Sequence, residues 1–279
     1  MVSVSPPFFP PELERAIFEI VAHLQPAAIP SLLLVSRRVH EWIERVRYQT
    51  VTANGELSSC RFQFLHRVIQ SQTKPRDFFA DRVQHLFVED IAAEELEAVL
   101  SVCTGIRFLI IFGFTESSSA PTLALLQSLR PHRLHIPLQL VMDARSSATP
   151  HPIFTSLTHL DIFHNPYDGI DHLASLPALT HLALLRSSSQ ATQILARCSA
   201  LELLVDMHAD EPNPDYLRSN DDVRFVSIVL SDDEYVTDWV TGTRGGLDFW
   251  ARGNMFVAKK CRGEIKPSSR CWIEDGDGI

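Results

Sequence analysis

The amino-acid sequence predicts a mixed α/β chain with three parts: a small amino-terminal helical module, a repeated strand–helix solenoid and a helical carboxy-terminal cap. Three observations predict this fold class. Apolar side chains recur at helical spacing after Pro11, one strand-like pattern repeats through residues 83–230, and a capping-box pattern begins at Ser231. With 279 residues, of which 45% are apolar and 21% charged, the chain has enough apolar side chains for a sizeable core.

Two helices are predicted near the amino terminus. In PELERAIFEIVAHL the apolar side chains that share one helical face are Leu13, Ile17, Val21 and Leu24. After Pro30, the same spacing returns at Leu32, Val35, Val39, Trp42 or Ile43, and Val46. About 40 residues are too few for a large independent core, so we expect this module to pack on a partner or on the rest of the chain.

The central part repeats a short motif in which an aliphatic residue is followed, three residues later, by the leucine or valine of a strand. The strand positions are Leu86, Leu109, Leu134, Leu160, Leu182, Leu204 and Val226. They are 22 to 26 residues apart, within the roughly 20–29 residue period of leucine-rich repeats. Helix-compatible segments lie between them, as parallel strands require. The spacing therefore predicts a leucine-rich-repeat-like α/β solenoid.

The amino-terminal residues resemble a known family. The strings PPELERAIFEIVAHL and SLLLVSRRVHEWI look like an F-box, in particular like the divergent F-box-like proteins of fungi. The resemblance implies binding to the Skp-type adaptor of a cullin-RING ubiquitin ligase. The residues that it implies for this interface are Pro11, Leu13, Ile17, Leu32, Leu33, Val35 and Trp42. The alternative interpretation is that these side chains form intramolecular core, as apolar stripes commonly do.

The strand pattern also predicts which side chains point to the concave face of the sheet, where a protein target would bind. They are His85, Phe87, Phe108, Arg133, His135, His159, Asp161, His181 and Phe225. The histidines at 135, 159 and 181 are expected to form a row. This row, together with Asp161, has a second interpretation as a metal or proton-sharing site, although repeated Leu-Thr-His-Leu strings favour histidine as a simple face residue.

Net charge, missing catalytic motifs and the cysteines further limit the classes of function that we expect. The net charge of −9 argues against nucleic acid and anionic membranes as partners. No Gly-x-Ser-x-Gly, His-Glu-x-x-His or Rossmann glycine pattern is present, so we expect no enzyme activity, no cofactor and no metal. Five separated cysteines, and the lack of an Asn-x-Ser/Thr acceptor, indicate the cytoplasm or the nucleus.

These observations predict a protein–protein interaction protein and, by resemblance, a substrate-recognition subunit of a Skp-cullin-F-box ubiquitin ligase. The alternatives are a ligase-independent leucine-rich-repeat scaffold and a cryptic hydrolase or metal enzyme that uses the histidine row. The expected divisions are an F-box-like module at 1–50, a linker or first capping unit at 51–82, the solenoid at 83–230, capping helices at 231–265 and an acidic tail at 266–279.

Overall fold

A computed structural model describes residues 9–53, 59–113, 119–135, 152–162, 170–185, 188–210 and 220–279. Residues 1–8 of the predicted amino-terminal module lie outside this range. The strands are β1 (Thr50–Ala53), β2 (His85–Glu89), β3 (Phe108–Phe112), β4 (Arg133–His135), β5 (His159–Ile162), β6 (His181–Leu185), β7 (Leu203–His208) and β8 (Phe225–Val229). They form one parallel sheet in which each strand pairs with the next along the chain.

Helices connect most of these strands. Before the sheet come α1 (Pro11–Leu24), the 3₁₀ turn η1 (Pro26–Ala28), α2 (Ile29–Leu32) and α3 (Arg37–Gln49). Between strands lie α4 (Ser59–Gln70), α5 (Arg76–Arg82), α6 (Ala93–Leu100), α7 (Ser119–Leu126), η3 (Pro152–Phe154), α9 (Ile170–Ala174) and α10 (Ser188–Arg197). After the last strand come α12 (Asp232–Thr243), α13 (Phe249–Cys261) and η4 (Asp275–Asp277).

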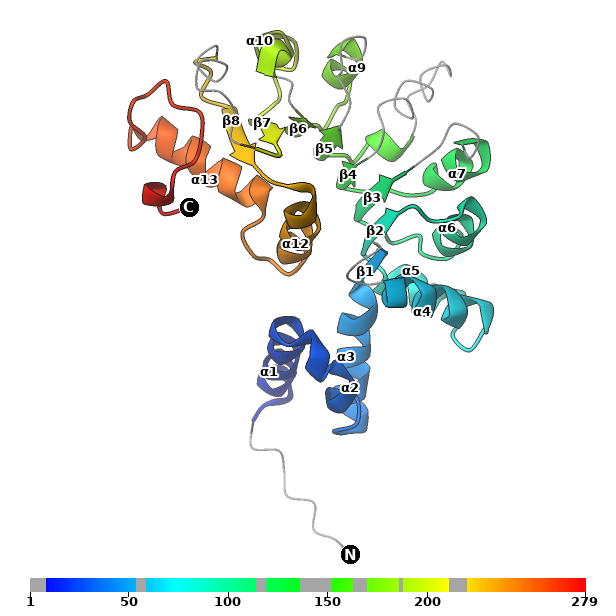
Figure 1. The fold of residues 1–279 in the computed structure, drawn as a ribbon. Coiled ribbons are helices and arrows are strands. Elements are labelled where there is room, and N and C mark those ends of the chain that lie inside the picture. The colour runs from blue at the N-terminus through cyan, green and yellow to red at the C-terminus, as the bar shows by residue number, and fades with distance from the viewer. Residues whose placement is uncertain are drawn as a thin grey trace, which may run out of the picture.

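The sheet is curved, and helices cover both of its faces (Figure 1). The connecting helices α4, α6, α7, α9 and α10 follow its outer side, whereas α12 and α13 lie on its inner side. We call these two sides the outer face and the inner face. The helices α1 to α3, called the N-terminal helices below, extend from the end of the sheet at β1.

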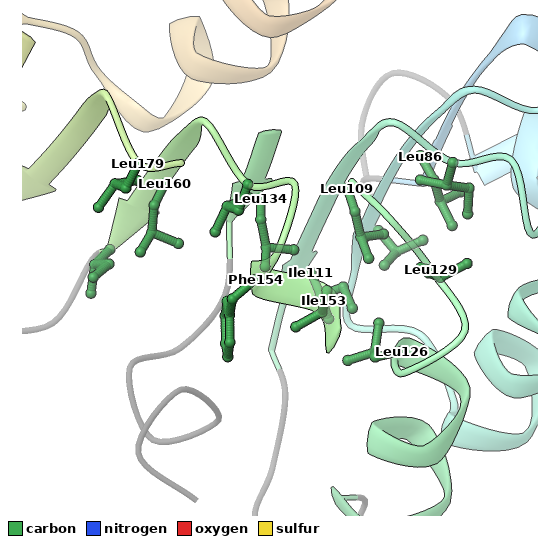
Figure 2. Packing of buried hydrophobic residues seen from close by; sticks show 14 of the residues in the cluster. Leu86, Leu109, Ile111, Leu126, Leu129, Leu134, Ile153, Phe154, Leu160 and Leu179 are labelled. Atoms are coloured by element: carbon green, nitrogen blue, oxygen red, sulfur yellow. The ribbon is translucent and has the colours of Figure 1, made fainter. Parts of the chain in front are cut away.

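The outer face carries the main hydrophobic core. Register places Leu86 opposite Leu109, Leu109 opposite Leu134, and Leu134 opposite Leu160, all of them fully buried. Figure 2 shows these leucines from successive strands gathered with apolar side chains from the connecting segments, which are labelled Leu126, Leu129, Ile153 and Phe154. One apolar layer therefore runs between the sheet and the connecting helices.

The expected fold class is wrong. The chain has one eight-stranded, all-parallel sheet with interleaved helices, rather than an F-box-like helical module followed by a leucine-rich-repeat-like solenoid and a helical cap. Helix α3 ends at Gln49 and β1 begins at Thr50, so the N-terminal helices continue directly into the sheet. The repeat pattern misses β1 because Tyr48, three residues before Val51, is not the aliphatic residue that the motif requires.

The carboxy-terminal helices also differ from the expectation. They were predicted to close the end of the repeats, but Trp239 and Trp250 lie in a core with Phe87 and Val205 of the inner face. Helix α12 begins as predicted after Ser231, because the Glu234 carboxylate accepts a hydrogen bond from the Ser231 backbone N–H at 3.0 Å. Two helices that cover a face bury more apolar surface than a cap over one end strand.

The last residues, expected to be an acidic tail, pack against the sheet. Arg270 and Cys271 are buried, and the backbone N–H of Ser227 in β8 donates to the carbonyl of Cys271 at 2.6 Å. Arg270 pairs with Asp277 at 2.6 Å. This segment pairs with the otherwise open edge of the last strand, which would expose unpaired backbone groups without it.

Gly105 lies in close contact with α5, and this contact gives a test of how the connecting segments pack. A Cβ atom on Gly105, just before β3, would lie 2.0 Å from the backbone oxygen of Ala80 in α5. Because a backbone oxygen cannot rotate away, we expect Gly105→Ala to lower the free energy of unfolding by about 2 kcal/mol or more. Urea unfolding measures the change. Gly276→Ala is the control, since nothing lies within 4 Å of its added Cβ; equal losses in the two variants would contradict the packing described.

Candidate functional site

The inner face, which the sequence predicts to bind a protein target, is the most polar part of the interior. Eight of the nine predicted residues lie on it, as the strand register shows. Phe225 does not: it pairs with Leu204 and packs in the outer core, whereas Val226 points inward. The last repeat copy was assigned one residue out of register, and a shift of one residue reverses the face.

The inner face is covered rather than open. His85, Phe87, His135, Asp161 and His181 are each at most 6% exposed, because α12 and α13 lie over them. Phe108, Arg133 and His159 are half-buried. A target protein therefore has no access to this face while the helices are in place, and the prediction of a concave target-binding surface is corrected accordingly.

One row of side chains crosses the sheet from β2 to β6. His85 stacks on Phe108 with ring centres 4.6 Å apart, and the Arg133 guanidinium lies 4.6 Å from the centre of the same Phe108 ring. His159 stacks on His181 at 4.0 Å. The row continues from Arg133 to His159 because these two residues are register partners.

Helix α13 completes this row. The Trp250 ring stands edge-on to His159 and His181, with ring centres 5.1 and 5.8 Å away. The Asn254 side chain lies 3.0 Å from Nε2 of His181. Stacked and edge-on aromatic contacts of this kind add stabilisation beyond simple burial. Helix α13 thus packs against both imidazoles and hydrogen-bonds the one of His181, which offsets part of the cost of burying them.

The predicted row of three histidines is not formed. His135 belongs to the neighbouring row, where it is the register partner of Asp161, with Nδ1 and Oδ2 3.9 Å apart. The Tyr235 hydroxyl, from α12, donates a hydrogen bond to the same Asp161 carboxylate. We call His135, Asp161 and Tyr235 the Asp161 cluster. Tyr235 could not be predicted from local sequence patterns, because its contact with Asp161 spans 74 residues of the chain.

Asp248 connects the first of these rows to α13. Its carboxylate accepts from Arg133 Nη1 at 2.5 Å and from the backbone N–H of Ala251 at 2.8 Å, which caps the first turn of α13. Nearby, Asp238 of α12 accepts from the backbone N–H of Phe249 at 2.8 Å and pairs with Arg252 at 2.7 Å. These charged contacts fix where α13 starts over the sheet.

Burial changes the titration of these groups. Burial, followed by the charges of Arg133 and Arg107, lowers the pKa of His85 to about 4. Burial, followed by the neighbouring His181, lowers the pKa of His159 to about 2. Burial raises the pKa of Asp161 to about 7, against the opposing effect of the Tyr235 hydrogen bond. The imidazoles are therefore held neutral at physiological pH.

The space around the Asp161 cluster is small. A cavity lined by Arg133, His135, Asp161, Asp248 and Trp250, among others, has a volume of about 10 Å³, roughly the room for one water molecule. In the described ranges, no three His, Cys, Asp or Glu side chains converge as a metal site would require. The arrangement holds α12 and α13 on the sheet, and its acid–base groups face one another rather than an open cleft.

The N-terminal helices present the opposite situation, since their apolar side chains are exposed. Seven of the nine large exposed apolar side chains in the described residues lie between 9 and 35: Phe9, Leu13, Ile17, Ile20, Leu24, Leu34 and Val35. We call them the apolar surface. On α1, positions 13, 17, 20 and 24 repeat at helical spacing and form one stripe.

Beneath this surface the N-terminal helices have a small core of their own. It contains Ala22, Ile29, Val39 and Ile43. Four of the predicted adaptor-binding residues, Pro11, Leu13, Ile17 and Val35, are exposed. The other three, Leu32, Leu33 and Trp42, are partly buried against this core. The predicted adaptor-binding set leaves out Ile20, Leu24 and Leu34, although Leu24 belongs to the helical face predicted for this segment. Ile20 follows Ile17 by three residues, a spacing that also places it on the exposed face of α1. The prediction used Val21, four residues after Ile17, for that position.

Comparisons with known proteins give no further assignment: no protein-family model matches the sequence, and neither does any curated protein. In the part of the chain that the structure describes, no helix has both the length and the apolar character that crossing a bilayer requires.

The buried imidazoles predict a pH-dependent stability. Between about pH 4 and 6.5 the unfolded chain protonates His85, His159 and His181, whose folded pKa values are lowered, so stability falls as the pH falls. Asp161 opposes this trend, because its raised pKa makes the folded state hold a proton that the unfolded state releases.

We expect His159→Phe, which keeps an aromatic ring beside His181, to reduce the slope of unfolding free energy against pH by about 1 kcal/mol per pH unit between pH 5 and 6. Urea unfolding at a series of pH values measures this slope. An unchanged slope in the variant would show that His159 is protonated in the folded state.

The hydrogen bond between Tyr235 and Asp161 predicts energetic coupling. Tyr235→Phe removes the hydroxyl that donates to a buried carboxylate, so we expect a loss of about 1 to 3 kcal/mol in the free energy of unfolding. In a cycle with Asp161→Asn, the two losses should be non-additive by about 0.5 kcal/mol or more. Additive losses would show that the two side chains contribute independently.

Proposed function

We propose that this chain is a protein–protein interaction subunit that docks through its N-terminal helices on a Skp-type adaptor of a cullin-RING ubiquitin ligase. The observation that carries the proposal is the apolar surface of residues 9–35. Contiguous exposed apolar side chains are typical of a surface that binds a protein, because each buried leucine or isoleucine stabilises a complex by roughly 1.5 to 3 kcal/mol.

The position of the exposed side chains supports docking rather than internal packing. Leu34, next to α2, is 85% exposed, and the α1 stripe points away from the small core that Ala22 and Ile29 form. An ion pair between Arg38 and Glu14 holds α3 against α1. The apolar surface therefore sits on a packed set of helices that need no further chain to complete their core.

The identity of the partner rests on the F-box resemblance of residues 11–43. In this proposal the adaptor covers Leu13, Ile17 and Val35, while Leu32, Leu33 and Trp42 support the helices from beneath. The subunit acts by bringing a bound target close to the ubiquitin-transferring subunits, and its own residues do no chemistry. The target docks outside the inner face, which α12 and α13 cover.

A reducing compartment, the cytoplasm or the nucleus, belongs to the same proposal. Cys103, Cys198, Cys261 and Cys271 all carry free thiols. Burial raises the pKa of Cys103 to about 12, which keeps this thiol protonated and unreactive. Thiols in this state need no oxidising environment.

The test is co-expression of the full chain with the Skp-type adaptor of its host, followed by gel filtration. We expect a one-to-one complex with the unaltered chain. Leu13→Glu combined with Ile17→Glu, or Leu34→Glu combined with Val35→Glu, should weaken binding at least a hundredfold, because charges are placed in an apolar interface.

Leu247→Glu is the matched control. Leu247 is 54% exposed, close to the 55% of Leu13, but it lies between α12 and α13, far along the chain from the apolar surface. It should leave the complex intact, and all variants should keep the thermal midpoint of the unaltered chain. Separate elution of the unaltered chain and the adaptor would overturn the adaptor proposal and favour a ligase-independent scaffold.

A further inference from the structure

A second cavity, of about 360 Å³, lies where the N-terminal helices meet the first strand and α4. Its lining comes from η1, α2, α3, β1 and α4: Pro26, Ile29, Pro30, Arg47, Tyr48, Val51, Arg61, Phe64, Leu65 and Arg67. We call it the basic cavity. Its volume is at the lower end of the range of small-molecule sites, roughly 300 to 1,000 Å³.

Three arginines reach this cavity from two helices. Arg47 comes from α3, and Arg61 and Arg67 come from α4. The Arg47 guanidinium lies 4.2 Å from the centre of the Phe64 ring, and Arg67 Nε donates to the carbonyl of Gln63 at 3.3 Å. Within the described ranges, no carboxylate lies within 4.0 Å of these three guanidinium groups.

Several arginines elsewhere in the described residues form ion pairs with carboxylates. Arg38 pairs with Glu14, Arg133 with Asp248, Arg224 with Asp222, Arg252 with Asp238 and Arg270 with Asp277. The chain has a net charge of −9, yet three arginines line this one cavity, and no carboxylate of the described residues forms an ion pair with them. An anion bound in this cavity would gain favourable charge interactions with these side chains.

A fourth cation adds to this positive charge. Arg244, just after α12, has its pKa lowered by burial and then by the charge of Arg61. Arg244 in turn contributes, after burial, to the lowered pKa of His23 in α1. The positive field therefore extends from the cavity toward α12, and it would attract an anionic ligand.

The rest of the lining is apolar. Tyr48, Val51 and Leu65 are buried, and Phe64 is half-buried beside them. Pro26, Ile29 and Pro30 line the cavity from η1 and α2. A ligand that fits this lining has one charged end for the guanidinium groups and an apolar, preferably aromatic, body for the ring and aliphatic side chains.

We propose that the basic cavity binds a small organic phosphate, with its phosphate against Arg47, Arg61 and Arg67 and its apolar body against Phe64 and Ile29. Phosphate is favoured over a carboxylate because three guanidinium groups match a dianion with several acceptor oxygens, and arginine binds phosphate through paired hydrogen bonds. The site involves none of the residues of the apolar surface, so it stands independently of adaptor binding.

The test is isothermal titration calorimetry of the full chain with phenyl phosphate as the probe. Inorganic phosphate and benzyl alcohol are the comparison ligands, since they carry only the charge or only the ring. We expect phenyl phosphate to bind at least tenfold more tightly than either, and its affinity to fall as the salt concentration rises.

Arg61→Gln and Arg67→Gln should each weaken phenyl phosphate binding at least tenfold, and Arg61→Lys should weaken it less than Arg61→Gln. Arg45→Gln is the matched control: Arg45 is exposed on α3, two residues from Arg47, and does not line the cavity. It should leave the affinity unchanged, and thermal melts should show that all variants are folded.

Three outcomes would overturn the proposal: no measurable heat with phenyl phosphate, equal affinity for inorganic phosphate, or an equal loss in Arg45→Gln and Arg61→Gln. If one arginine variant fails to fold, Arg47→Gln provides the same comparison, because Arg47 is exposed on the same helix as Arg45.

Discussion

The packing of α12 and α13 on the inner face is the constraint on which the rest of this structure depends. A parallel sheet is stable when both faces are covered, and here the inner face carries histidine, arginine and aspartate side chains. Covering them with apolar helices alone would remove hydrogen bonds that Arg133 and Asp161 make to these helices, at a cost of several kcal/mol each. Tyr235, Asp248 and Asn254, on or next to these helices, provide hydrogen-bond partners for the polar groups of the inner face.

The same contacts explain how the cover is positioned. Asp248 both pairs with Arg133 of β4 and caps α13, so the helix begins directly above the middle of the sheet. Toward β7 and β8 the inner face becomes apolar, and there Gly253 lets α13 approach Leu203 closely. Polar pairing in the centre and apolar packing near β8 together specify one position for the helix pair, as satisfied buried polar networks commonly do.

The sequence predicted those features that depend on local periodicity. The strand leucines from Leu86 to Leu204 are register partners across six strands, as their spacing indicated, because each must bury its side chain under a connecting helix. The prediction failed where a strand lacked that signal, at β1, and where one residue decided the register, at Phe225. Side chains alternate between the two faces of a strand, so a prediction assigns every residue to the correct face only if its first residue is assigned correctly.

The candidate sites were harder to predict, because they depend on contacts between distant parts of the chain. The sequence grouped Asp161 with a row of His135, His159 and His181, but the covering Tyr235 is 74 residues from Asp161 and lies in α12. The three arginines of the basic cavity belong to two helices joined through β1, and single-residue patterns do not predict that they converge. Composition even pointed away from them, since the chain as a whole is acidic.

The distribution of buried and exposed surface determines where this chain can meet other molecules. The outer face is covered by the connecting helices and the inner face by α12 and α13, while the segment after α13 pairs with β8. What stays exposed and apolar is concentrated on the N-terminal helices, which begin at the opposite end of the sheet. Because the basic cavity lies where these helices join β1, a ligand bound there would contact both the N-terminal helices and the sheet, and would favour one position of the apolar surface relative to the rest of the chain.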